Sequence, residues 1–115
     1  MKYLVGADEI IADYGYFPTF HDDIIESIII FPDKKITVEM QTLPCNAKSY
    51  PKVNFICNNV HKFELSYDRI VIEEKEFDQI FQLDFEENEE YIELSIGGIY
   101  SSGFIRCENI QILKD

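Results

Sequence analysis

Residues 14–23 read Tyr14-Gly15-Tyr16-Phe17-Pro18-Thr19-Phe20-His21-Asp22-Asp23, so that aromatic residues, a proline and a His-Asp-Asp cluster follow one another. This stretch separates a short helical pattern from the most apolar run of the chain, Ile24 to Phe31. Pro18 prevents a helix from continuing through it, because proline lacks the N–H and its ring clashes with the preceding turn. The stretch therefore predicts a helical segment before it and a β-rich body after it.

A short amphipathic helix is predicted upstream. Apolar residues fall at i, i+3, i+4 and i+7, which places Ala7, Ile10, Ile11 and Tyr14 on one helical face. Gly15 follows directly, as is typical of the residue that ends a helix in the left-handed conformation. A helix of about two turns is not stable in isolation. We therefore expect it to pack on the rest of the chain.

The downstream chain alternates between apolar and polar residues, which is typical of strands. Ile24 to Phe31 is apolar on both alternating faces and predicts a strand covered on both sides. With the strand predicted over 36–40, it forms a hairpin. Further strands are predicted near 53–57, 61–67, 70–72, 80–86, 92–96 and 104–113.

Three breaks in this pattern carry predictions of their own. Asn58-Asn59-Val60 is compatible with a hairpin loop that sets Phe55 opposite Phe63, or with a bulge inside one bent strand. A phase slip near Glu108-Asn109 predicts another bulge, and residues 101–103 predict a turn. Because short turns make successive strands antiparallel, we expect an α+β fold. Residues 1–115 would form one domain, a mainly antiparallel curved sheet of about seven or eight strands with the short N-terminal helix packed on it.

Charge and composition exclude several classes of function. The net charge of −12 disfavours binding to nucleic acid or to anionic membranes, since both carry negative phosphates. No apolar run approaches the roughly 20 residues that span a bilayer, and no secretory signal is evident. Three widely spaced cysteines, an odd number, favour free thiols in a reduced cytoplasmic protein.

The acidic residues are concentrated in one part of the chain. Between Glu64 and Glu93 there are twelve acidic residues and only two basic ones. The densest group is Glu86, Glu87, Glu89 and Glu90. Carboxylates this close must stay solvated, because like charges repel. The group is either a solubilising turn or a docking surface for a basic partner, to which an exposed Tyr16 would add an apolar anchor.

No catalytic or metal-binding motif stands out. His21 and Asp22 are adjacent, and on an extended chain they would point to opposite sides. A metal site needs three or four ligands, and His61 is the only other histidine. Cys57 lies near His61 only in the hairpin alternative, and buried cysteines usually behave as small apolar residues. We expect no enzyme activity and no cofactor.

Residues 15–24 resemble the Trp-Pro-Ser-Phe-His-Asp-type opening of the bacterial immunity protein 50 family, with Phe17 in place of the expected tryptophan. Residues 103–110 are similar to the last strand of that family. The motif positions are Pro18, Phe20, His21 and Asp22. The residue types themselves favour a structural role for these positions. The resemblance implies a protein that protects its cell from a cognate toxin.

The leading hypothesis is therefore a non-enzymatic immunity protein that binds and neutralises a bacterial toxin, one with a basic surface if the acidic group docks it. The alternative is a small ligand- or metal-binding β-rich domain that uses the His21-Asp22 region. A homodimer through an exposed sheet edge is compatible with either function.

Overall fold

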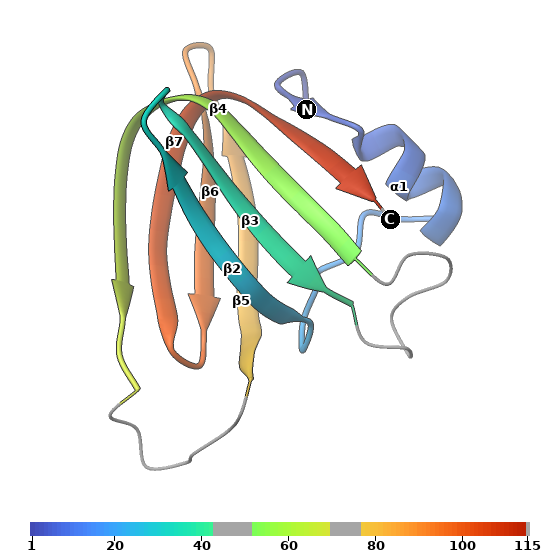
Figure 1. The fold of residues 1–115 in the computed structure, drawn as a ribbon. Helices are drawn as coiled ribbons and strands as arrows, with labels where there is room; N and C mark the ends of the chain where they lie inside the picture. Colours follow the sequence, from blue (N-terminus) through green and yellow to red (C-terminus); the bar gives the residue numbers. More distant parts are fainter. Residues whose placement is uncertain (43–51, 70–76, 115) are drawn as a thin grey trace.

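The computed structural model of the chain describes residues 1–42, 52–69 and 77–114. In chain order its elements are β1 (Leu4–Val5), α1 (Ala7–Tyr14), β2 (Ile24–Phe31), β3 (Lys35–Gln41), β4 (Lys52–Tyr67), β5 (Asp78–Glu87), β6 (Ile92–Gly98) and β7 (Ser101–Lys114). Figure 1 shows one strongly curved sheet with α1 at its edge. The predicted combination of a sheet and a short N-terminal helix is thus confirmed.

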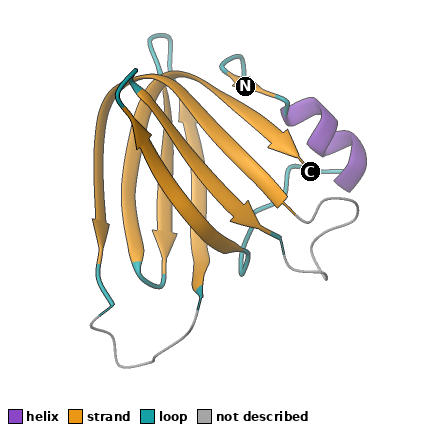
Figure 2. Ribbon diagram, viewed as in Figure 1, coloured by secondary structure: helices purple, strands orange, loops and turns teal. Residues whose placement is uncertain are grey.

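The seven strands form one sheet in the order β1-β7-β4-β3-β2-β5-β6, and β6 also pairs with β7. All pairs are antiparallel except β1 with β7, so the sheet is mixed. This parallel pair was not predicted, because two residues are too short to show a periodicity. β4 and β7 are long and bent, and they carry the sheet over from one layer to the other (Figure 2).

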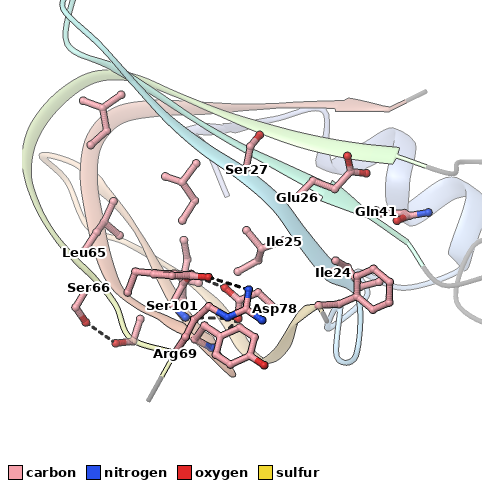
Figure 3. Close-up of a pocket in the computed structure, with 17 residues that line it drawn as sticks. Ile24, Ile25, Glu26, Ser27, Gln41, Leu65, Ser66, Arg69, Asp78 and Ser101 are labelled. Atoms are coloured by element: carbon pink, nitrogen blue, oxygen red, sulfur yellow. Dashed lines mark hydrogen bonds between the residues drawn. The ribbon is translucent and has the colours of Figure 1, made fainter. Parts of the chain in front are cut away.

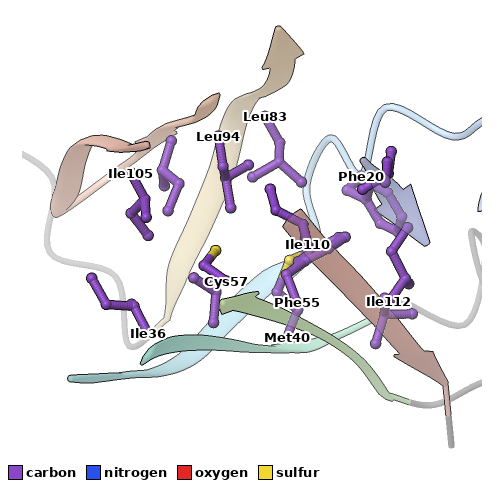
Figure 4. Close-up of a cluster of buried hydrophobic side chains, with 14 of the residues drawn as sticks. Phe20, Ile36, Met40, Phe55, Cys57, Leu83, Leu94, Ile105, Ile110 and Ile112 are labelled. Atoms are coloured by element: carbon purple, nitrogen blue, oxygen red, sulfur yellow. The ribbon is translucent and has the colours of Figure 1, made fainter. Parts of the chain in front are cut away.

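The core lies between the two layers. Its largest fully buried side chains include Phe55, Met40, Leu94 and Ile105, which come from four different strands (Figure 4). The buried residues of β3 and β6 repeat at every second position, because alternate side chains of a strand point into the core. Both strands were therefore predictable from the alternation of apolar and polar residues. The predicted strand at 70–72 lies outside the described residues.

The helix forms and ends where its sequence predicts, but Ile11, which the spacing placed on the packed face, is 41% exposed. Gly15 has a φ of 84° and donates its N–H to the carbonyl of Ile11 over 2.7 Å, which closes the C-terminus of α1. Ile10 and Tyr14 are buried in the core. On the outer face, Lys114 of β7 lies 3.2 Å from Glu9 and 3.3 Å from Asp13. The helix is therefore packed on the end of β7.

The prediction that β2 is covered on both sides is wrong. Ile24 and Ile25 are buried, but the second half of the strand is exposed, including Ile30 at 55%. The reason is that β2 pairs with β5 only at its first two residues, and no other strand of the described ranges pairs with that edge beyond them.

The break at residues 58–60 is resolved in favour of one bent strand. β4 runs unbroken from Lys52 to Tyr67 and pairs with β7 throughout, with a register shift between Val60 and Lys62. Asn59 adopts a φ of 51°, and Asn58 donates a side-chain hydrogen bond of 2.9 Å to Asn109 on β7. In β7 the buried positions change phase near Glu108-Asn109, from Ile105 and Cys107 to Ile110 and Ile112. The bulge predicted there lies on β4 instead, because the register shift skips a residue between Val60 and Lys62 while Cys107 and Arg106 are consecutive on β7.

The turn predicted at residues 101–103 is also wrong, because β7 already begins at Ser101 and the chain turns at Ile99-Tyr100. Gly103 pairs with Leu65 inside the sheet. A Cβ on Gly103 would lie 1.9 Å from the carbonyl oxygen of Glu64. The glycine therefore permits a close approach of two strands and does not mark a turn.

Candidate functional site

The predicted His-Asp motif lies in a tight corner that joins β2 to β5, which we call the closing corner (residues 20–25 and 78–80). The N–H of Asp22 donates to the carbonyl of Ile80 over 2.9 Å, and the N–H of Ile80 donates to the carbonyl of Asp23 over 2.9 Å. Phe20 and Asp22 have positive φ values of 57° and 71°. The corner is thus a specific backbone arrangement that brings the start of β2 beside the start of β5.

Phe20 anchors this corner in the core. Its ring is buried and makes edge-to-face contacts with Phe17 at 5.9 Å and Phe55 at 5.4 Å between centroids. Pro18 is partly buried just before it. These placements agree with a structural role for Pro18 and Phe20.

His21 and Asp22 do come together, contrary to the expectation for an extended chain. Nδ1 of His21 lies 3.2 Å from a carboxylate oxygen of Asp22, and both side chains are about half exposed. The left-handed conformation of Asp22 is what turns the two side chains to the same side. Within the described ranges, no three His, Cys, Asp or Glu side chains are grouped so that they could hold a metal ion. The pair therefore has no third ligand in the part of the chain that the structure describes.

Cys57 does not form a site with His61. Cys57 is fully buried in the core (Figure 4). Its thiol interacts with that of Cys107. The hydrogen bond with Cys107, together with burial, raises the pKa of the Cys57 thiol. A protonated, buried thiol is a poor nucleophile. His61 is exposed on the other side of the β4 bend.

The acidic group forms the turn between β5 and β6, which we call the acidic turn (residues 86–90). Asn88 shapes it, since its side-chain oxygen accepts the N–H groups of Glu90 at 2.8 Å and Tyr91 at 2.9 Å. The side chains of Glu86, Glu89 and Glu90 are exposed and make no ion pair with any described residue.

Glu87 differs from its three neighbours. Its carboxylate accepts the backbone N–H groups of Lys2 at 3.0 Å and Tyr3 at 3.2 Å, so it fastens the N-terminus to the turn. The Tyr3 hydroxyl donates to the carbonyl of Glu89 over 2.9 Å. Of the four predicted docking glutamates, three are therefore available to a partner and one is used by the fold.

A small hollow of about 380 Å³ adjoins the acidic turn, lined by Glu86, Glu87, Asn88, Tyr91, Glu93 and Arg106. Arg106 is held by Glu93 at 2.7 Å, and this hydrogen bond raises the pKa of its guanidinium group. Arg106 is therefore paired with Glu93 and not with a glutamate of the acidic turn. Tyr16, the predicted apolar anchor, is 63% exposed and lies in the segment that follows α1, its ring 6.4 Å from that of Tyr14.

A larger groove was not predicted from the sequence. A hollow of about 730 Å³ lies between β2 and the second half of β4, where the two sheet layers separate (Figure 3). Its floor and walls include Ile25 and Ile28 from β2, Leu65 and Ser66 from β4, and Asp78. Sequence reasoning missed it because it depends on which strand edges stay unpaired, and alternation within a strand does not show pairing.

Asp78 closes the lower end of this groove. Its carboxylate accepts the N–H of Tyr100 at 2.8 Å, the N–H of Ser101 and the hydroxyl of Ser101. Gly98 makes room for it, because a Cβ there would lie 2.5 Å from the Asp78 carboxylate. The carboxylate is thus fully engaged in holding the turn between β6 and β7.

Comparisons with known proteins identify the fold and nothing beyond it. No protein-family model matches the chain, and no curated protein matches it. Among solved structures, the chain is similar to an uncharacterized protein from Neisseria gonorrhoeae, with a TM-score of 0.58 and 18% sequence identity over 81% of this chain and 91% of that one. The chain therefore shares a sheet-rich α+β fold with that protein. The family suggested by residues 15–24 stays a prediction.

The structure also bears on membrane insertion. The described ranges contain no helix that is long and apolar enough to cross a membrane.

Proposed function

We propose that this chain is a non-enzymatic immunity protein that acts in the cytoplasm and neutralises a bacterial toxin by binding it through the acidic turn. The observation that carries the proposal is the exposure of Glu86, Glu89 and Glu90, whose charges are not neutralised by any described cation. The resemblance of residues 15–24 to immunity proteins supplies the biological role.

The physical argument is electrostatic. Three exposed carboxylates within five residues raise the local negative potential, which steers a basic partner toward the turn and rejects acidic ones. The turn is also rigid, because Asn88 holds its backbone and Glu87 ties it to the N-terminus. A rigid docking surface loses little conformational entropy when it binds.

The test has two stages. The protein is first used to capture its partner from a native lysate, with washes at low and high salt, and the partner is identified by mass. The association rate is then measured for the wild type and for the triple variant Glu86→Lys, Glu89→Lys, Glu90→Lys, which leaves Glu87 in place. We expect association to slow by about tenfold or more at low salt and to lose most of its salt dependence.

The matched control reverses three exposed carboxylates elsewhere, Asp33→Lys, Glu64→Lys and Asp84→Lys, and so changes the net charge equally. A toxin docked on the acidic turn responds strongly only to the first variant. Equal association rates for the two triple variants would remove the turn from the interface. Protection of cells that express the captured toxin then tests the immunity role itself.

A further inference from the structure

Two regular strand edges have no neighbouring strand within the described ranges. Residues 27–31 of β2 pair in continuous register with β3, and their other edge is unpaired because β5 meets β2 only at Ile24 and Ile25. Residues 62–67 of β4 pair in continuous register with β7, and their other edge is unpaired because β3 reaches only to Cys57. Each edge presents a row of backbone N–H and C=O groups to another chain.

The two edges face each other across the groove. The hollow of about 730 Å³ is lined by β2 on one side and by residues 65–67 of β4 on the other. A second hollow of about 350 Å³ continues it between the end of β2 and residues 60–63 of β4, and Ile30 lines both. Figure 1 shows that β2 and the second half of β4 run in opposite directions on the two sides of this space. At its far end, the N–H of Val60 donates to the carbonyl of Lys34 over 2.7 Å and joins the two walls.

Large apolar side chains are exposed along the groove. Ile30 is 55% exposed and Phe63 is 41% exposed, and both line the second hollow. Tyr67 and Phe77 are more than half exposed and line the first. Apolar side chains gathered along a hollow in this way are characteristic of an interaction site.

The groove is also basic, in a chain with a net charge of −12. Lys34, Lys35, Lys62 and His61 line the second hollow, and no carboxylate does. Arg69 lines the first hollow, with its guanidinium 4.5 Å from the Tyr100 ring centroid. The first hollow has two carboxylates, but Asp78 is engaged by Tyr100 and Ser101. The other, Glu26, lies 3.8 Å from Lys52.

We propose that this groove binds an extended segment of a partner protein in which apolar and acidic residues alternate. The segment would add a strand between β2 and β4, antiparallel to one and parallel to the other, so that its main chain pairs with both free edges. Its apolar side chains would pack on Ile30 and Phe63, and its carboxylates would face the lysines. This binding site is separate from the acidic turn and does not depend on the function proposed for it.

The probe is a synthetic ten-residue peptide with blocked ends that alternates Val and Glu, and its control replaces every Glu with Lys. Binding is measured by NMR titration of the full chain, and hydrogen exchange is followed at the amides of residues 27–31 and 62–67. We expect the Val-Glu peptide to bind and to slow exchange at both edges, and the Val-Lys peptide to bind at least about tenfold more weakly, since charge complementarity sets specificity.

Matched variants test the apolar and the basic contributions separately. Ile30→Ser and Lys62→Glu should each weaken binding by about fivefold or more, as expected for one lost contact of about 1 kcal/mol. Val5→Ser and Lys2→Glu make comparable apolar-to-polar and charge-reversing changes at exposed positions outside the groove and should leave the affinity unchanged.

Three results would overturn the proposal. The first is no binding of the Val-Glu peptide at millimolar concentration, and the second is equal affinity for the two peptides. The third is a solution mass that doubles with concentration while the same amides become protected, since a second copy of this chain would then occupy the groove.

Discussion

β5 begins at Asp78 and ends at Glu87, and acidic residues lie at both of its ends, but the two ends are built differently. At its start, Asp23 and Asp78 are buried in the closing corner, where backbone N–H groups and a hydroxyl surround the Asp78 carboxylate. At its end, Glu86, Glu89 and Glu90 project from the acidic turn into solvent. Both ends carry carboxylates, yet one end stabilises the fold and the other is available to a partner.

The difference teaches that local donors, rather than charge density, decide the role of an acidic residue. A carboxylate that accepts several backbone hydrogen bonds contributes to stability even when buried. A carboxylate without such donors must remain hydrated. Glu87 combines features of both groups, since it belongs to the acidic turn by sequence but its carboxylate accepts two backbone N–H groups. The comparison can be tested by substitutions at both ends of β5.

The largest effect is expected for Phe20→Ala in the closing corner. Phe20 is only 3% exposed and contacts both Phe17 and Phe55, so its removal leaves a cavity where β2 joins β5. We expect a loss of about 3–5 kcal/mol in the free energy of unfolding, measured with urea. Phe81→Ala removes an equally large but exposed ring and should cost less than about 1 kcal/mol. Similar losses for both variants would contradict a buried anchor at Phe20.

A smaller effect is expected for Asp78→Ala. The substitution leaves the N–H of Tyr100 and the N–H and hydroxyl of Ser101 without their acceptor at a buried position. We expect a loss of about 2–3 kcal/mol in the free energy of unfolding, because hydrogen bonds to charged groups are the stronger ones. Asp78→Asn keeps one acceptor oxygen and should lose less. A loss below about 0.5 kcal/mol for Asp78→Ala would show that the turn does not need the carboxylate.

Features of the fold could be predicted from the sequence where the interacting residues lie close together along the chain. The helix and the β2–β3 hairpin depend on neighbours a few residues apart, and both were predicted correctly, the helix from its spacing and Gly15 and the hairpin from two apolar patterns close in sequence. The bend of β4 depends on its pairing with β7, about 50 residues away, so Asn58-Asn59 could be read as either loop or bulge. The exposure of Ile30 depends on where β5 stops pairing with β2, which no local pattern contains.

The candidate sites show the same limit. The acidic turn was predictable because four glutamates in five residues cannot be buried together. The hydrogen bonds of Glu87 were not predictable, because their donors, the backbone N–H groups of Lys2 and Tyr3, come from the far end of the chain. The contact of His21 with Asp22 was missed because a left-handed φ is uncommon at a non-glycine residue, even at Asp, and the sequence pattern suggested an extended chain.

Glu87→Ala should have an intermediate effect that separates Glu87 from the rest of the acidic turn. Its carboxylate fastens the N-terminus through two backbone hydrogen bonds, one of which is partly buried. We expect a loss of about 1 kcal/mol in the free energy of unfolding and faster hydrogen exchange at the amides of Lys2 and Tyr3. Glu86→Ala, on the same strand, is the control and should leave both amides unchanged. Unchanged exchange in Glu87→Ala would show that the N-terminus is held by β1 alone.

The smallest effect on stability is expected when the exposed charges of the acidic turn are neutralised. The triple variant Glu86→Gln, Glu89→Gln, Glu90→Gln removes no described ion pair and relieves repulsion among three carboxylates. The free energy of unfolding should change by less than about 1 kcal/mol, toward higher stability at low salt. The gain should vanish near 1 M salt, where the screening length falls to about 3 Å. A clear loss of stability at low salt would mean that these glutamates serve the fold, as Asp78 does, and the contrast between the two ends of β5 would fail.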